Sequence, residues 1–582
     1  MPLKGEVIFM NRKPNGSLIP RIGISAIIIF LMYYFELPPI NLRSQSFWSF
    51  LMQSILVLLV VNGLNVIREI ITQSRAEQTI AFHFRDLKQL SKPFFLGAIA
   101  VILIFLLQIS GSVIGNPFFH SGSYANLINI EEGDFSADVA ELSMNQIPVV
   151  DKDTAQRLGN RKLGEMSDLV SQFEIMDLYT QINYQGTPYR VTPLQYGDTI
   201  KWFTNRKQGL PAYVMVNMVK QEATLKRLDE GMKYSTSEYF FRNIYRHLRF
   251  SHPTLIFDFA DLSFEIDEAG TPYWVAPVIN YRIGIWSGKD VSGVVLVNAI
   301  TGEDAYYKLE DIPTWVDQVF ISSLIMNQLD YNGMYQNGFI NSIFGQKGVK
   351  QTTQGYNYIA IGDDVYLYTG MTSVTSDESN TGFMLVNLRT KDARYYAVPG
   401  ATEYSAMGSA EGQVQQMKYN ATFPLLLNIS DRPTYFLSLK DAAGLVKMYA
   451  FVDVEQYQVV GTGTNVRLAM ENYATALGIE NGTLDPNSSP GNGENTGNNQ
   501  TGTETETPLT PEASISGTIS AVSSAVVGGN TRSYFLLDSG SEIYTASISL
   551  DPYLPFLKAG DTVTFDYAVT GSTRTICSLQ HQ

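Results

Sequence analysis

Two stretches of this chain, residues 293–309 (GVVLVNAITGEDAYYKL) and 382–398 (GFMLVNLRTKDARYYAV), are near-copies of each other. At a constant offset of 89 residues they share Gly, Leu, Val, Asn, Thr and a Tyr-Tyr pair, without a gap. The apolar run before the Asn predicts a half-buried strand, and the Asn-x-x-Thr step predicts a tight turn. A repeat at this spacing predicts an array of small, similar modules.

Fainter copies extend the array. Residues 213–217 read YVMVN and residues 451–455 read FVDVE, and matching strands stand upstream at 186–193 (GTPYRVTP) and 270–277 (GTPYWVAP). Between the strands lie helical patterns, so the modules are predicted to be α+β units with antiparallel sheets. The predicted helical stretches are residues 151–166, 238–248, 411–418 and 466–477.

The copy around residue 293 resembles the PepSY-type module. In that family a strand like the PYW of residues 272–274 pairs with a strand that ends in an Asn-x-x-Thr-Gly-Glu turn, here Asn298 to Glu303. Copies that lack the glycine, with Asp392 or Glu455 in place of Glu303, leave their turn type open.

The resemblance extends over about residues 130–470. Residues 311–317 (DIPTWVD) and 410–415 (AEGQVQ) are similar to membrane-anchored proteins of Gram-positive bacteria that carry such modules. It implies an extracytoplasmic protein that regulates a peptidase or binds a cell-envelope ligand, and it does not imply catalysis.

The charge of the chain is divided between two regions. The formal net charge of the whole chain is −15. Residues 1–92 carry an excess of bases and the remainder a large excess of acids. The bases flank three apolar runs, which predict a membrane anchor over residues 1–115 with three transmembrane helices in contact with lipid. These runs cover about residues 22–40, 47–67 and 94–114.

Bases also set the expected orientation of the anchor. Residues 1–21 and the loop 68–92 are rich in Lys and Arg, whereas the loop between the first two runs contains one base, Arg43. The positive-inside rule then places the N-terminus in the cytoplasm and everything after about residue 115 outside. The expected localisation is the cell membrane, as a multi-pass protein.

The rest of the chain is expected to hold four parts. PepSY-like modules are predicted over residues 116–345 and 346–480, and a disordered linker rich in Asn, Gly, Thr, Ser and Pro over 481–512. Five short strands in residues 513–582 predict a small all-β, OB-like barrel. The predicted fold class is therefore α+β with an anchor, a module array and a terminal barrel.

Barrels of this kind bind oligonucleotides or oligosaccharides. Tyr534, Tyr544 and Tyr567 are candidates for a stacking face, although tyrosines at strand spacing are also ordinary half-buried sheet residues. The acidic balance of the chain argues against nucleic acid as the ligand.

A basic segment is the one candidate ligand patch in the modules. It would bind an anionic envelope polymer, or else form a basic helix end that pairs with the acidic strand after it. The two histidines stand five residues apart with no glutamate between them, so no metal site is expected. The patch consists of Arg242, Arg246, His247, Arg249 and His252.

No sequence motif for catalysis is present. Gly-x-Ser-x-Gly, Walker and dinucleotide-binding patterns do not occur, and there is one cysteine. We therefore expect no catalytic residue, cofactor or metal, and predict a non-enzymatic envelope protein that binds or scaffolds a protein or envelope ligand, with regulation of a peptidase as one form. One alternative is a membrane-bound hydrolase that uses carboxylates in a cleft between modules. Another is an accessory subunit of a transporter, which the uncharged apolar runs disfavour.

Overall fold

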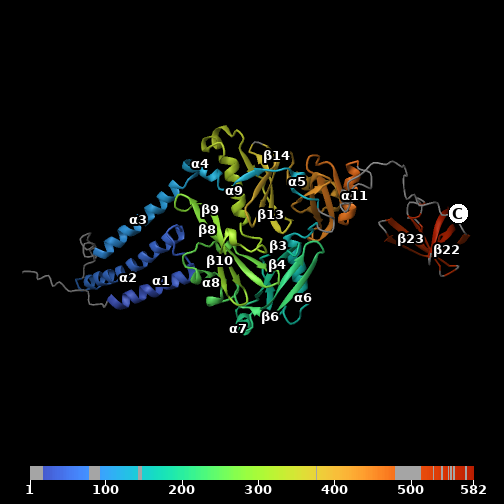
Figure 1. The fold of residues 1–582 in the computed structure, drawn as a ribbon. Helices are drawn as coiled ribbons and strands as arrows, with labels where there is room; N and C mark the ends of the chain where they lie inside the picture. Colours follow the sequence, from blue (N-terminus) through green and yellow to red (C-terminus); the bar gives the residue numbers. More distant parts are fainter. Residues whose placement is uncertain are drawn as a thin grey trace, which may run out of the picture. The chain divides into compact units, whose positions relative to one another are not determined.

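The computed structural model shows a mixed α+β protein that divides into two compact units, Met1–Ser489 and Pro490–Gln582 (Figure 1). The predicted linker at 481–512 lies outside the described residues. The structure describes residues 18–77, 92–141, 147–374, 376–478, 513–527, 530–538, 540, 542–547, 550, 554, 557–570 and 573–581.

Three helices open the first unit: α1 (Leu18–Glu36), α2 (Gln45–Glu77) and α3 (Lys92–Ile114). The prediction of three transmembrane helices is wrong. Within the described residues, one helical segment, Phe94–Ile114, is long and apolar enough to cross a membrane. It has 21 residues, and most of its side chains are exposed, as contact with lipid requires.

The other two apolar runs fall short for different reasons. The run predicted at 22–40 ends as a helix at Glu36; after it Leu37 to Pro39 are buried and Ile40 is exposed. There the amide of Ile40 donates to the carbonyl of Pro253, which fixes this connector to the modules. In α2 the apolar stretch within the residues whose side chains the structure describes is Gln45–Val61, which is shorter than a membrane span needs.

Four sheets follow, each built around one long antiparallel hairpin; the pair β1–β15 of the third sheet is parallel (Figure 1). The first hairpin is β4 (Thr187–Tyr196) with β5 (Leu210–Asn217), and the second is β8 (Pro272–Ile283) with β9 (Ser287–Asn298). The third is β13 (Asp364–Ser373) with β14 (Ser376–Asn387), and the fourth is β19 (Arg432–Lys440) with β20 (Val446–Asp453).

Shorter strands complete each sheet. The first sheet adds β2 (Phe173–Ile175), β3 (Thr180–Tyr184) and β6 (Glu222–Met232); the second adds β7 (Ser263–Ile266) and β10 (Asp304–Lys308). The third adds β1 (Ile130–Glu132), β11 (Lys350–Thr352), β12 (Asn357–Ile361), β15 (Ala393–Tyr396) and β16 (Gly400–Ala401). The fourth adds β17 (Asn420–Ala421), β18 (Leu425–Ile429) and β21 (Val460–Gly463).

Short helices lie between the strands and close the sheet faces. Asp151 caps α6 by accepting a hydrogen bond from the amide of Thr154, and Asn465 caps α11 through the amide of Leu468. The helices are α4 (Pro117–Ala125), α5 (Phe135–Asp138), α6 (Lys152–Gly164), α7 (Thr199–Asn205), α8 (Ile244–Ser251), α9 (Ser322–Tyr335), α10 (Glu403–Gln413) and α11 (Val466–Ala476).

The turn after the second hairpin strand is the same in three sheets. The Oδ1 atoms of Asn217, Asn298 and Asn387 each accept hydrogen bonds from the amides two and three residues on. The residue four positions on has a positive φ, and it is Gln221, Gly302 or Lys391. The copies without glycine therefore use the same turn, with a left-handed non-glycine residue that costs about 1 kcal/mol.

In the fourth sheet the equivalent residue is Asp453, whose Oδ1 accepts from the amide of Gln456. This corrects the sequence alignment, which placed the turn residue two positions later, at Glu455.

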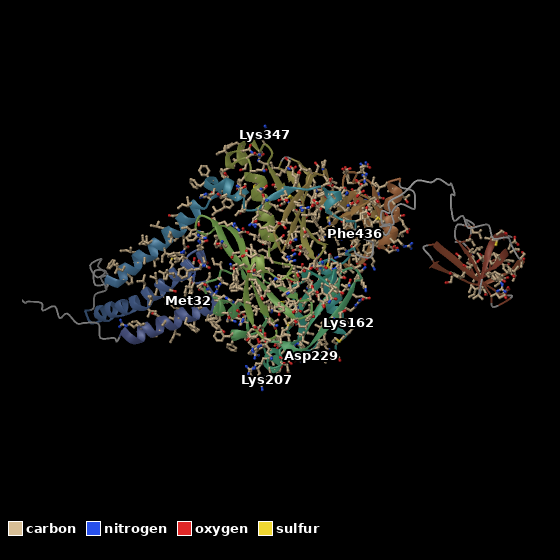
Figure 2. All side chains as sticks on the ribbon, in the orientation of Figure 1. Met32, Lys162, Lys207, Asp229, Lys347 and Phe436 are labelled. Carbon is tan, nitrogen blue, oxygen red and sulfur yellow. The ribbon has the colours of Figure 1, made fainter. Side chains whose placement is uncertain are left out.

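The four sheets share their apolar interior. One core contains Val214, Trp274, Phe383 and Phe436, one residue from each of the four hairpins. Figure 2 shows the side chains on the ribbon; Phe436 is buried, whereas Lys347 lies on the outer surface. Because an apolar core joins them, the modules form one body rather than separate domains connected by linkers.

The second unit is a closed five-stranded barrel with the order β22-β23-β24-β26-β25, and the five predicted strands are confirmed. The pair β24–β26 is parallel and the other pairs are antiparallel. The strands are β22 (Ala513–Val527), β23 (Asn530–Leu537), β24 (Ile543–Ser547), β25 (Thr562–Thr570) and β26 (Thr573–His581).

Candidate functional site

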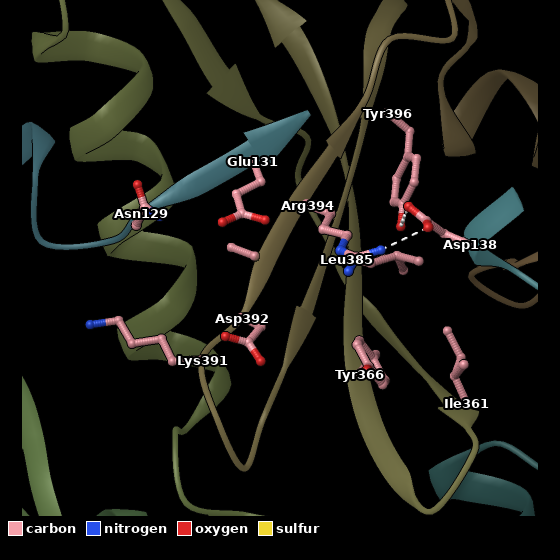
Figure 3. Close-up of a pocket in the computed structure, with 11 residues that line it drawn as sticks. Asn129, Glu131, Asp138, Ile361, Tyr366, Leu385, Lys391, Asp392, Arg394 and Tyr396 are labelled. Carbon is pink, nitrogen blue, oxygen red and sulfur yellow. Dashed lines mark hydrogen bonds and ion pairs between the residues drawn. The ribbon is translucent and has the colours of Figure 1, made fainter. Parts of the chain in front are cut away.

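A polar hollow of about 410 Å³ lies on the third sheet (Figure 3). Strand β1 adds to the edge of this sheet by pairing in parallel with β15, which sets Glu131 opposite Arg394. Asp392, Arg394 and Tyr396 follow one another at every second position, so their side chains lie on one face. The hollow is therefore built by chain segments about 260 residues apart.

Internal ion pairs hold the two cations of the hollow. The guanidinium of Arg394 lies 2.7 Å from a carboxylate oxygen of Asp138, and the hydroxyl of Tyr396 donates to the same carboxylate at 3.2 Å (Figure 3). Burial, reinforced by Asp138, raises the pKa of Tyr396 to about 12. The Nζ atom of Lys391 lies 2.7 Å from Asp290 Oδ1 and donates to the carbonyl of Leu127.

Two acids of the hollow have no such cation. The carboxylates of Glu131 and Asp392 both line the hollow, and Figure 3 shows them separated from each other. Asp392 accepts a hydrogen bond from the hydroxyl of Thr390, and within the described parts of the chain no Lys or Arg pairs with either acid. The hollow thus carries an uncompensated negative charge, which suits a cationic group on a ligand.

The predicted basic patch is used within the fold. Arg249 is 1% exposed and donates to the carbonyls of Leu37 (2.8 Å) and Leu255 (2.6 Å). Arg246 stacks on the ring of Tyr34, with 4.5 Å from its guanidinium carbon to the ring centroid, and Arg242 donates to the carbonyl of Arg206. Arg249 and Arg246 thus contact the C-terminal end of α1, whereas Arg242 contacts the end of α7.

The two histidines of the patch meet one acid. The Nε2 atoms of His247 and His252 lie 2.9 and 2.7 Å from the two carboxylate oxygens of Asp304. This acid comes from β10 of the second sheet. The geometry therefore resembles the second interpretation of the patch, a basic helix end that pairs with an acidic strand, although the strand is β10 and not the one directly after the helix. The sequence signal for Asp304 was its place directly after the Thr-Gly-Glu turn.

A pair of buried carboxylates lies where the first three sheets meet. Glu265 is 0% exposed and accepts hydrogen bonds from the amides of Asp317 and Gln318 and from the hydroxyl of Ser263. Asp317 is 1% exposed; its Oδ2 accepts from the amide of Asn183, and its Oδ1 has no partner.

Burial dominates the titration of this pair. It raises the pKa of Glu265 to about 7, and burial and the charge of Glu265 raise the pKa of Asp317. Carboxyls with raised pKa values are typical of hydrolases, but neither side chain reaches solvent, so no substrate can approach them in this conformation.

The three barrel tyrosines do not share one face. Tyr544 is 1% exposed and packs against Phe565 and edge-on to Tyr567 in the barrel core. Phe535 pairs with Tyr544 and points inward, so Tyr534, its neighbour in sequence, points the other way. The structure thus brings Tyr544 and Tyr567 together and places Tyr534 on the other side of the sheet.

No group of three or more His, Cys, Asp or Glu side chains among the described residues could hold a metal ion. Comparison with known proteins found no matching family model and no matching curated protein. The PepSY-like and OB-like assignments therefore stay predictions.

Proposed function

We propose that the protein is a non-enzymatic, membrane-attached protein of the cell envelope that holds a cationic group of a protein partner in the hollow on the third sheet. The charge of the hollow carries this proposal. Arg394 and Lys391 are engaged by acids of the same chain, whereas Glu131 and Asp392 face the hollow without a cation. A Lys or Arg side chain of a partner would complete the set.

The orientation of the modules follows from the candidate span. Five bases in residues 68–92 precede Phe94–Ile114, and the chain after it is strongly acidic. The positive-inside rule places the basic side in the cytoplasm and the modules outside.

The repeated hairpin guides the choice of partner. Four hairpins that end in an Asn or Asp turn support a PepSY-like array, and that resemblance makes an envelope peptidase the partner class to test first. The hydrolase alternative is less well supported, because the carboxylates with the most strongly raised pKa values are buried.

The test is capture from solubilised envelope membranes by the immobilised full-length protein. We expect a partner to be retained by the wild type, released by raised salt, and lost by the double variant Glu131→Lys/Asp392→Lys. The matched control is Glu222→Lys/Asp229→Lys, which reverses two exposed acids on β6 and should retain the partner. A partner that the hollow variant holds as well as the wild type would contradict the proposal.

A further inference from the structure

A buried arginine outside the hollow lacks a neutralising partner. Arg190 on β4 is 6% exposed, and its Nε has no hydrogen-bond partner. No carboxylate of the described residues forms an ion pair with its guanidinium, and burial is the main influence on its pKa, which it lowers. An unpaired buried cation is strongly unfavourable, so this position calls for a negative partner.

The repeat shows how unusual the residue is. Arg190 pairs across its hairpin with the residue directly before the turn asparagine, and the same register position is held by Trp274, Leu367 and Tyr435 in the other three sheets. Those three side chains are fully buried. The first sheet thus has a cation where its sister sheets have a core apolar or aromatic residue.

Arg190 lines a small cavity of about 30 Å³. The cavity lies where Arg190 of β4 meets Asn357 of β12, Ser438 of β19 and the segment 148–151. A volume of this size admits one or two water-sized particles, and therefore a monatomic ion but no larger headgroup.

Charges around the cavity leave an excess of one cation. The carboxylate of Asp151 is bound by Lys440 and by the amide of Thr154, which neutralises that pair. Tyr358 is also near, but burial raises its pKa and its hydroxyl forms a hydrogen bond with that of Ser322. Asp153 acts on Arg190 only through the longer-range field.

We propose that the cavity binds one small monovalent anion, for which chloride is the natural candidate, and that this anion joins the first, third and fourth sheets. The guanidinium of Arg190 supplies the charge. The hydroxyl of Thr422, which also lines the cavity, accepts from the amide of Ser438 and so has its proton available for the anion. The rival occupant is water, which would accept a hydrogen bond from Arg190.

The test follows thermal unfolding of the purified full-length protein as chloride replaces gluconate at constant ionic strength and pH. A site specific to the folded state predicts a Tm that rises with chloride, on the order of 1 °C for each tenfold increase above the dissociation constant. Arg190→Met should abolish this dependence. Arg389→Met, which removes a guanidinium paired with Asp364, is the matched control and should keep it.

A direct measurement guards against a variant that does not fold. Crystals of the wild type soaked in bromide should show an anomalous peak beside the guanidinium of Arg190. Equal Tm values in the two salts, a chloride response that survives Arg190→Met, or a cavity that holds water without bromide would each overturn the proposal.

Discussion

Arg249 and Arg190 are both buried, yet their surroundings are opposite. Arg249, at 1% exposure, donates to carbonyls at the end of α1 and after α8, and it lies over the rings of Phe257 and Phe259. Arg190, at 6%, borders a cavity and has no acceptor from the described residues. The first arginine holds the anchor connector to the modules, whereas the second requires something from solution.

The buried acids show the same contrast. Glu265 has donors on both oxygens, whereas the Oδ1 atom of Asp317 has none. Burial alone therefore does not reveal the role of a charged group in this protein. The hydrogen-bond and ion-pair partners of a buried charged group distinguish a structural charge from one that needs a proton or an ion.

The largest expected effect is from Arg249→Met. It leaves the carbonyls of Leu37 and Leu255 without their donor in a buried place, so we expect a loss of about 3–5 kcal/mol in the free energy of unfolding. Chemical denaturation of the full-length protein measures it. Arg227→Met, which breaks an exposed pair with Asp168, is the control and should change little. A loss no greater than that of the control would mean that Arg249 does not hold the connector after α1 to the modules.

The next effect concerns pH and the two acids. Their folded pKa values are raised, so between about pH 4.5 and 7 the folded state holds protons that the unfolded chain releases. Stability should therefore fall as pH rises through this window, by on the order of 1–3 kcal/mol. Asp317→Asn keeps the shape, removes one charge and should flatten the slope. An unchanged slope in this variant would show that Asp317 does not contribute to the pH dependence of stability.

A smaller effect is expected at the histidine pair. Asp304→Asn removes the negative charge shared by His247 and His252 while preserving its size, and it should cost about 1 kcal/mol. Unfolding at pH 6 measures it. Asp304→Asn should leave capture by the hollow unchanged, because Asp304 lies on another sheet; a parallel loss of capture would show that the two regions are coupled.

Much of the module architecture could be predicted from the sequence, because hairpins and turns are local. The Asn turns and the alternating strands at 293–309 and 382–398 appear in the structure where their residues indicate. The anchor could not be predicted in the same way. Leu37 and its prolines contribute to an apolar run in the sequence, but tertiary contacts bury them against the modules instead.

The hollow and the arginine cavity depend on long-range pairing. Nothing local indicates that β1 would join β15 and bring Glu131 into the hollow that Asp392 also lines. The sequence did carry a signal for Arg190. The aligned strands read GTPYRVTP and GTPYWVAP, so Arg190 stands where the other strand has Trp274. A charged residue at a position that the fold buries is inconsistent with the pattern of the strand. Such conflicts mark sites of function.

The most direct test of the contrast is to measure Arg190→Met and Arg249→Met side by side in chloride-free gluconate buffer. Arg190→Met removes an unpaired charge and fills its place with an apolar chain, so its free energy of unfolding should equal or exceed that of the wild type. Arg249→Met should lose about 3–5 kcal/mol under the same conditions. Equal losses in the two variants would contradict the account, because both arginines would then be structural and neither would need an ion.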